Sequence, residues 1–141
     1  MSARWLWAGV AAGLAACGPS PPQQLGEQLG EQLERIASAT RTTELTARQW
    51  GDGSLPDGYA IQMSRIAGQS LRRIARRPIW QHAPADIRDT ALDHAAASAA
   101  LADRLGQAAR SGDRAAATGL ASRSARLAAA TRRLRERVSP R

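Results

Sequence analysis

Cysteine and aromatic residues are scarce in this chain of 141 residues, which has one cysteine and no phenylalanine. A single cysteine excludes an intramolecular disulfide and a metal site built from several cysteines. Aromatic side chains make up only 4 % of the residues, so a core must consist mainly of small and aliphatic side chains. Its stability must therefore come from the packing of such side chains alone.

Lysine is also missing, and every one of the 20 basic residues is an arginine. They outnumber 12 acidic residues and give a net charge of +8. Alanine is abundant, and alanine and arginine are both good helix formers, whereas few residues favour strands. The composition predicts an all-α fold of one domain.

The first 16 residues have the layout of a signal peptide. Arg4 supplies a positive charge, and an apolar stretch follows at residues 5–14. That stretch is shorter than the roughly 20 apolar residues that cross a bilayer. Small residues then lead to Cys17. We expect residues 1–16 to be removed from the mature chain.

The segment Leu14-Ala15-Ala16-Cys17 resembles the lipobox of bacterial lipoprotein signals. The resemblance implies lipid transfer to the Cys17 thiol, cleavage before it and acylation of the new amino terminus, which together would anchor the chain in a membrane. Gly18 rather than Asp implies the outer membrane, facing the periplasm. The alternative is an ordinary cleaved signal with a cysteine there by chance.

A proline-rich tether at residues 17–22 precedes a predicted helical bundle at 23–138, because prolines lack the donors that a helix interior needs. We expect four helices, at about 23–48, 56–77, 84–109 and 114–138, separated by Gly, Pro, Ser and Asp clusters. Ser54 and Asp57 could form a capping box around Pro56.

Each predicted helix carries one apolar stripe, which predicts an up-down four-helix bundle. The inward positions would be Leu25, Leu29, Leu33 and Ile36 in the first helix; Tyr59, Met63, Ile66, Ser70, Leu71 and Ile74 in the second; Ile87, Ala91, His94, Ser98, Leu101 and Leu105 in the third; and Leu120, Ser124, Leu127, Thr131, Leu134 and Val138 in the fourth. Acidic residues in the third helix should pair with arginines of its neighbours.

Residues 80–137 weakly resemble the C-terminal half of the cytochrome c-prime family. The likeness consists of Trp80 before a helix, Leu101-Ala102-Asp103-Arg104-Leu105 within it, and the connector Gly112-Asp113. Where that family has its Cys-x-x-Cys-His motif, this chain has residues 127–131, Leu-Ala-Ala-Ala-Thr. The attachment cysteines and the axial histidine are missing, so covalent haem is not implied.

Met63 and His94 are the candidate ligands for a non-covalent haem. Both fall on predicted inward stripes of neighbouring helices, and counting from the connector at 78–83 puts their heights within roughly 6 Å. A Met/His pair can ligate haem iron, as in four-helix b-type cytochromes. The alternative is that Met63 fills a core gap and His94 is hydrogen-bonded to Ser98 or to a facing hydroxyl.

Two arginine-rich runs are candidates for binding an anionic partner. They comprise Arg72, Arg73, Arg76 and Arg77 in the second helix and Arg132, Arg133 and Arg135 in the fourth. For an exported protein without stacking aromatics we expect no nucleic acid; anionic lipid or an acidic envelope protein is the predicted partner. A solvated charged face without a ligand is the alternative.

No catalytic motif with the spacing of a known nucleophile, phosphate loop or metal site was found in the sequence. The sequence therefore predicts a small non-enzymatic lipoprotein of the bacterial cell envelope, with a structural or partner-binding helical domain and no cofactor. A haem-binding or redox protein that uses Met63 and His94 is the alternative.

Overall fold

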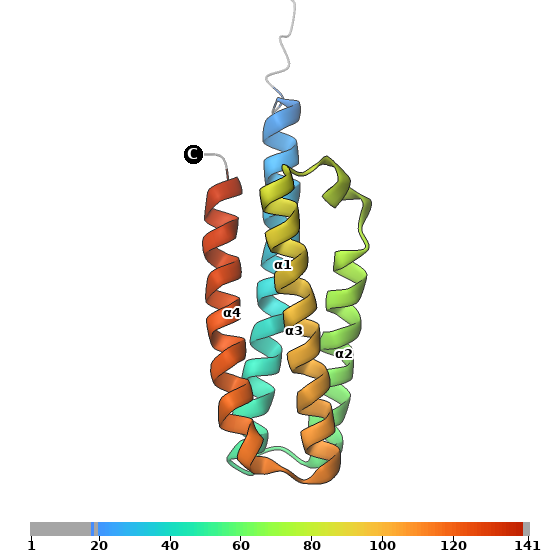
Figure 1. Ribbon diagram of the computed structural model, residues 1–141, viewed down its shortest axis with the longest axis vertical. Coiled ribbons are helices and arrows are strands. Elements are labelled where there is room, and N and C mark those ends of the chain that lie inside the picture. Colours follow the sequence, from blue (N-terminus) through green and yellow to red (C-terminus); the bar gives the residue numbers. More distant parts are fainter. Residues whose placement is uncertain (1–17, 19, 140–141) are drawn as a thin grey trace, which may run out of the picture.

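The computed structural model describes residues 18 and 20–139, which form an up-down bundle of four helices (Figure 1). α1 is Pro21–Gly51, α2 is Asp57–Ala75, α3 is Ala85–Ser111 and α4 is Ala117–Val138. Two short 3-10 turns, η1 (Pro78–His82) and η2 (Arg114–Ala116), precede α3 and α4. The described residues contain no strand. The prediction of an all-α four-helix bundle is confirmed.

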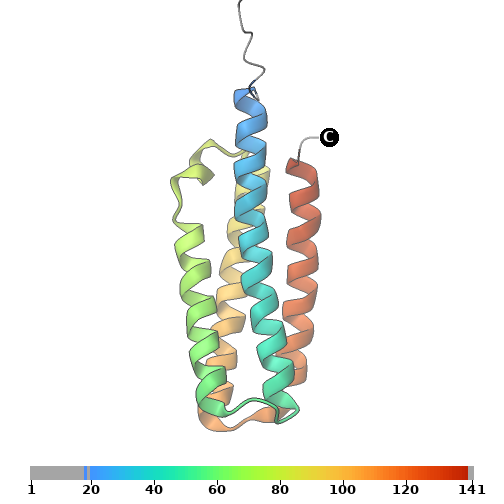
Figure 2. The same cartoon turned by 180° about the vertical axis from the view of Figure 1, so that it is seen from behind.

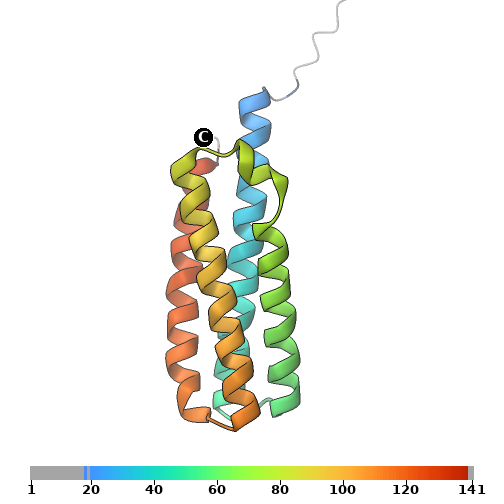
Figure 3. The same cartoon turned by 45° about the vertical axis from the view of Figure 1, so that its right-hand side comes forward.

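The first turns of α1 project beyond the other three helices in every view (Figure 1, Figure 2 and Figure 3). The connection through η1 and the C-terminal end of α4 lie at this same end of the bundle (Figure 1). The α1/α2 and α3/α4 connections lie at the opposite end (Figure 1). The start of α1, η1 and the end of α4 therefore lie at one end of the bundle (Figure 1).

The predicted tether is shorter than expected, because α1 begins at Pro21 and includes Pro22. The prediction that these prolines are not helical is wrong. The first backbone N–H groups of a helix have no intrahelical acceptor, so a proline there loses no hydrogen bond. The Ser20 N–H just before the helix donates to Gln23 Oε1 at 3.0 Å. The predicted signal peptide and Cys17 lie outside the described residues.

The predicted capping box at Ser54 and Asp57 is also wrong. Pro56 occupies the N-cap of α2, and the Ser54 N–H donates to Asp52 Oδ1 at 2.9 Å within the preceding turn. The Asp57 carboxylate accepts instead from Trp50 Nε1 at 2.7 Å. This hydrogen bond joins the end of α1 to the start of α2, and it satisfies the one polar atom of a fully buried indole.

Four of the remaining helix ends differ from prediction by two or three residues, whereas α3 begins one residue later than predicted and α4 ends at Val138 as predicted. α1 continues to Gly51 and α3 to Ser111, whereas α2 stops at Ala75. Residues 114–116 form η2, so α4 begins at Ala117. Pro78 starts η1, which buries Trp80, and the Trp80 Nε1–H donates to Ile74 O at 2.9 Å. The buried indole thus closes the C-terminal end of α2.

α2 is rotated relative to its predicted inward stripe. Tyr59 is 48 % exposed and Ile66 is 51 % exposed, although both were expected in the core. Only Leu71 and Ile74 of the large residues in that stripe are buried. The face that packs inward carries mostly small residues, namely Ala60, Ser64, Ala67 and Gly68. Small side chains let α2 approach α3 closely, and this contact outweighs the burial of two larger side chains.

The predicted stripes of the other three helices are mostly buried. Leu25, Leu127 and Val138 are only half-buried, as is His94, while the remaining predicted positions are in the core. Many of these positions hold alanine or a hydroxyl side chain. Thr40 Oγ1, for example, lies 2.7 Å from both Ile36 O and Ser98 Oγ, which satisfies two buried hydroxyls across the bundle.

The four helices pack unequally around this core. Contacts are most extensive between α1 and α4 and between α2 and α3, and they are sparser between α1 and α2 and between α3 and α4. Glycines permit the close approaches: a Cβ on Gly106 would lie 2.8 Å from Ser64 Oγ, and one on Gly51 would lie 2.7 Å from Ala117 Cβ. The bundle therefore consists of two close helix pairs separated by two more open gaps.

Candidate functional site

The α3/α4 groove is an open depression of about 630 Å³ along the more open side of the bundle. Alanine and leucine side chains form its floor, and arginines from both helices form its rim. Its lining residues are Ala97, Ala100, Leu101, Arg104, Arg123, Arg126, Leu127, Ala130 and Arg133. Apolar surface and positive charge thus lie side by side.

Helical spacing places these arginines on one edge. Arg123, Arg126 and Arg133 follow each other along α4 with Ala130 between, at steps of three, four and three residues, and such positions share one helix face. Arg104 reaches the groove from α3. Of these four residues only Arg133 was predicted as a binding residue, because it belongs to a run of adjacent arginines. The three-and-four spacing along α4 is the sequence signal for Arg123 and Arg126, whereas no such signal marks Arg104 of α3.

The four rim arginines are without an ion-pair partner in the part of the chain that the structure describes. No carboxylate of the described chain lies within 4.0 Å of Arg104, Arg123, Arg126 or Arg133 as an ion pair, and no acidic residue lines the α3/α4 groove. Arg126 Nη1 donates only to Ser122 Oγ, at 3.1 Å. Four guanidinium groups therefore face solvent around one apolar floor, and their hydrogen-bond donors are available to an anion.

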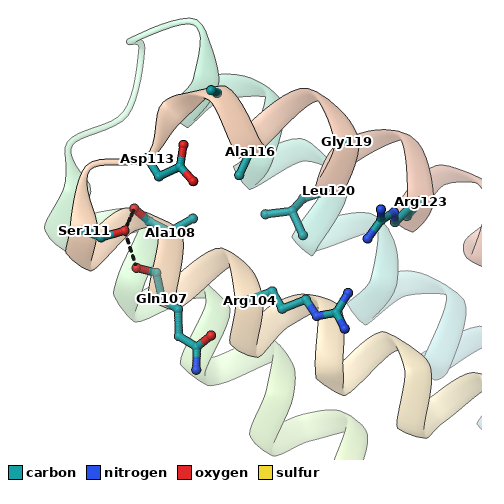
Figure 4. A pocket seen from close by; sticks show the side chains of 10 residues that line it. Arg104, Gln107, Ala108, Ser111, Asp113, Ala116, Gly119, Leu120 and Arg123 are labelled. Carbon is teal, nitrogen blue, oxygen red and sulfur yellow. Dashed lines mark hydrogen bonds between the residues drawn. The ribbon is translucent and has the colours of Figure 1, made fainter.

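A second depression of about 480 Å³ continues the groove toward η2 (Figure 4). Arg104 and Arg123 line both depressions, one from each helix, and Leu120 lies between them and Ala116 in Figure 4. Toward the connector, Ser111 Oγ lies 3.1 Å from Gln107 O. The combined groove thus runs along most of α4, with two arginines flanking its middle.

The α1/α2 gap holds another groove of about 500 Å³, which contains part of the first predicted arginine run. Arg73 and Arg77 line it, together with Met63, Ile66 and Arg35. The rotation of α2 explains why these apolar side chains lie there.

The first predicted run does not form one surface. Arg72 pairs with Asp103 of α3, which confirms the expected pairing with that helix. Arg76 is exposed and makes no ion pair within the described residues. Only Arg73 and Arg77 therefore share a groove.

The second predicted run is divided in the same way. Arg133 lines the α3/α4 groove, whereas the neighbouring Arg132 is exposed outside it. Arg135 Nη1 donates to Glu34 Oε2 of α1 at 2.6 Å, and Arg137 pairs with Asp86 of α3 at 3.0 Å. Within less than two turns of α4, these arginines thus point to different neighbours, which is why adjacency in sequence does not define a binding face.

His94 is hydrogen-bonded to a facing hydroxyl, one of the two partners expected, and not to Ser98. Its Nδ1 lies 3.1 Å from Thr131 Oγ1 of α4. That hydroxyl donates to Leu127 O at 2.9 Å, so we assign Nδ1–H of His94 as the donor to Thr131. Burial lowers the pKa of His94, and the negative charge of Asp93 opposes this shift.

Met63 and His94 lie between different pairs of helices. Met63 is half-buried and lines the α1/α2 groove, whereas His94 contacts α4 through Thr131. The haem interpretation stays a prediction, and an absorption spectrum recorded with added haemin would test it. In the described part of the chain, no three His, Cys, Asp or Glu side chains are grouped to hold a metal ion. Within the same residues, no helix is both long and apolar enough to cross a bilayer.

Comparisons with protein-family models, with curated proteins and with solved structures each found no match to this chain.

Proposed function

We propose that this chain is a small, non-enzymatic, lipid-anchored protein of a bacterial cell envelope, whose helical bundle binds a partner.

 The observation that carries the proposal is the Leu14–Cys17 motif, which ends only four residues before the first residue of a rigid helix, Pro21. The membrane would be the outer membrane, with the bundle in the periplasm.

The position of α1 supports an anchor at Cys17. Residues 17–20 can span at most about 14 Å when extended, so a lipid on Cys17 would hold the start of α1 next to the bilayer surface. The first turns of α1 project from the bundle and would act as a spacer (Figure 1). Arg76 and Arg77, at the end of α2 near η1, would then face the lipid headgroups.

The two grooves support partner binding as the role of the bundle. Both combine an apolar floor with arginine side chains, and an apolar patch beside unpaired charge is typical of a surface that recognises a partner. The partner classes that fit this chemistry are anionic lipid and acidic protein. We propose no cofactor and no nucleic acid.

Metabolic labelling tests the anchor. A bacterial host that expresses the full chain is grown with an alkyne-tagged palmitate, and the purified protein is examined for the tag and by intact mass. We expect a labelled, membrane-bound mature chain, and an unlabelled precursor for Cys17→Ser. Ser20→Ala, three residues away, is the matched control and should be labelled normally. A wild-type chain that is cleaved but carries no lipid would contradict the proposal.

A further inference from the structure

The α3/α4 groove has the chemistry of a docking site for a helix. Its floor is shallow: Ala97 and Ala100 are exposed, and Leu127 and Ala130 are half-exposed. An open trough of this kind does not enclose an acyl chain on all sides, whereas small floor residues let another helix approach closely. We propose that the α3/α4 groove binds an acidic amphipathic helix of another protein.

The length of the groove matches a helix of ordinary size. From Ala116, the last residue of η2, to Arg133 of α4 the groove spans 17 residue steps, which is about 25 Å at 1.5 Å per residue. A partner helix of about 18 residues covers this distance. Its apolar stripe would lie on Leu120, Leu127 and the alanines, which recur at helical intervals.

The charges of the rim specify the flanks of the partner helix. Arg123, Arg126 and Arg133 line one side and Arg104 the other, and none of them forms an ion pair in the described chain. Asp113 lines the groove only at its η2 end, beyond these arginines in the lining of the α3/α4 depression. Glu or Asp on both flanks of the apolar stripe would pair with them. Bidentate contacts between guanidinium and carboxylate groups would fix the register of the helix.

A second copy of this chain is a poor occupant. Each copy carries a net charge of +8, so two copies repel each other. Seven acidic side chains in the described residues already pair with arginines of the same chain: Glu31, Glu34, Glu44, Asp57, Asp86, Asp89 and Asp103. The bundle therefore has few acidic side chains to offer to the groove of another copy.

The inference rests on the partner-binding part of the proposed function and is independent of the anchor. The test uses the mature chain with Cys17→Ser, which keeps every residue that the structure describes, so its failure would leave the lipidation result unaffected. The probe is a fluorescein-labelled peptide of 18 residues, with Leu and Ala along one helical face and Glu on both flanks. A peptide with Lys in place of each Glu is the charge control.

Fluorescence anisotropy measures the binding of each peptide. We expect the acidic peptide to bind, the Lys peptide not to bind, and the affinity to fall as salt is raised. The double variant Arg123→Glu/Arg126→Glu should weaken binding at least about tenfold. The matched variant Arg41→Glu/Arg65→Glu makes the same change in net charge at exposed arginines outside the α3/α4 and α1/α2 grooves, and it should change affinity less than about threefold.

A steric variant separates docking in the groove from general attraction of charge. Ala100→Trp fills the exposed floor without removing any arginine, and it should weaken binding at least about tenfold. Circular dichroism checks that each variant remains helical.

Four results would overturn the inference. The first is that the acidic peptide does not bind, and the second is that both double variants lose the same amount of peptide affinity. The third is that sedimentation velocity detects dimers that depend on Arg123 and Arg126. The fourth is that phosphatidylglycerol vesicles bind through the groove while the peptide does not. The last result would assign the groove to lipid instead.

Discussion

The α2/α3 interface and the α3/α4 groove share one helix but differ in what the second helix contributes. Toward α3, α2 presents Ser64, Ala67 and Gly68, and the two helices approach until Gly106 has no room for a side chain. Along the other side of α3, α4 contributes arginines, and a groove remains. On these two sides of α3, the close contact is therefore the one where both helices present small residues.

Charge reinforces the effect of side-chain size on both sides of α3. Arg72 of α2 pairs with Asp103 of α3, so the close interface is bridged by opposite charges. Arg104 and Arg123 flank the groove with like charges, which repel each other and favour separation of α3 from α4 (Figure 4). Each effect is modest at an exposed site. Together with side-chain size, they explain why one gap is open and the other is closed.

The largest expected effect compares the two faces of α2. Leu71→Ala removes a fully buried side chain and should lower the free energy of unfolding by about 2–5 kcal/mol. Ile66→Ala, on the outer face, should change it by less than about 0.5 kcal/mol, because that side chain is half exposed. Urea unfolding followed by circular dichroism measures both values. A larger loss of unfolding free energy for Ile66→Ala than for Leu71→Ala would show that Ile66 packs inward, as the sequence predicted.

The next effect compares the close interface with the groove directly. Gly106→Leu places a side chain where Ser64 leaves no room, and we expect a loss of about 1–3 kcal/mol. Ala100→Leu adds a larger side chain at the exposed floor of the groove and should change stability by less than about 0.5 kcal/mol. The same urea titrations measure both variants. Equal losses would show that α3 packs equally tightly on its two sides.

A smaller effect compares two buried serines. Ser98→Ala removes the hydrogen bond to Thr40 and should cost about 1 kcal/mol. Ser124 Oγ is buried without a partner in the described residues, so Ser124→Ala removes an unsatisfied polar atom and should raise stability by up to about 1 kcal/mol. Thermal unfolding distinguishes the two directions. A loss for Ser124→Ala would indicate a partner for that hydroxyl.

The smallest effect concerns His94 at the interface of α3 and α4. Burial lowers its pKa in the folded chain below the usual value near 6.5, so at acidic pH the unfolded chain takes up a proton more readily than the folded chain does. Stability should therefore fall as the pH drops through about 6.5 and level off below the folded pKa. Thermal unfolding at several pH values measures the slope. His94→Gln should reduce it, and an unchanged slope in that variant would contradict the assignment.

The sequence predicted the four helices and most of their buried positions, because apolar residues recur at helical spacing in α1, α3 and α4. It was misleading for α2, where Tyr59, Met63 and Ile66 form a larger apolar stripe than the small residues that pack inward. Periodicity records side-chain size, but it does not record how closely a neighbouring helix can approach. Pro21 was predicted to lie outside the helix because proline disrupts a helix interior. It lies in the first turn of α1, where proline is tolerated.

The groove was largely hidden in the sequence for a related reason. Runs such as 72–77 and 132–137 are conspicuous, yet successive residues of a helix point to different sides. The structure distributes them among ion pairs, solvent and two grooves. Arg104, Arg123 and Arg126 become neighbours only when α3 and α4 are placed side by side, which depends on the packing of the whole bundle.

The most direct test of the open groove is the reactivity of a single cysteine placed in it. Because Cys17 is the one cysteine of the sequence, its replacement leaves an introduced thiol as the one that can react. In the Cys17→Ser chain, Ala130→Cys places one thiol in the groove, and Ala128→Cys places one at a position that is 1 % exposed. A maleimide dye should label the Ala130→Cys variant at least about a hundredfold faster than the Ala128→Cys variant, because the buried thiol reacts only after local opening. Addition of the acidic peptide should slow labelling of the Ala130→Cys variant alone. Equal labelling rates would contradict the open groove, and fast labelling that the bound peptide leaves unchanged would show that the peptide binds elsewhere.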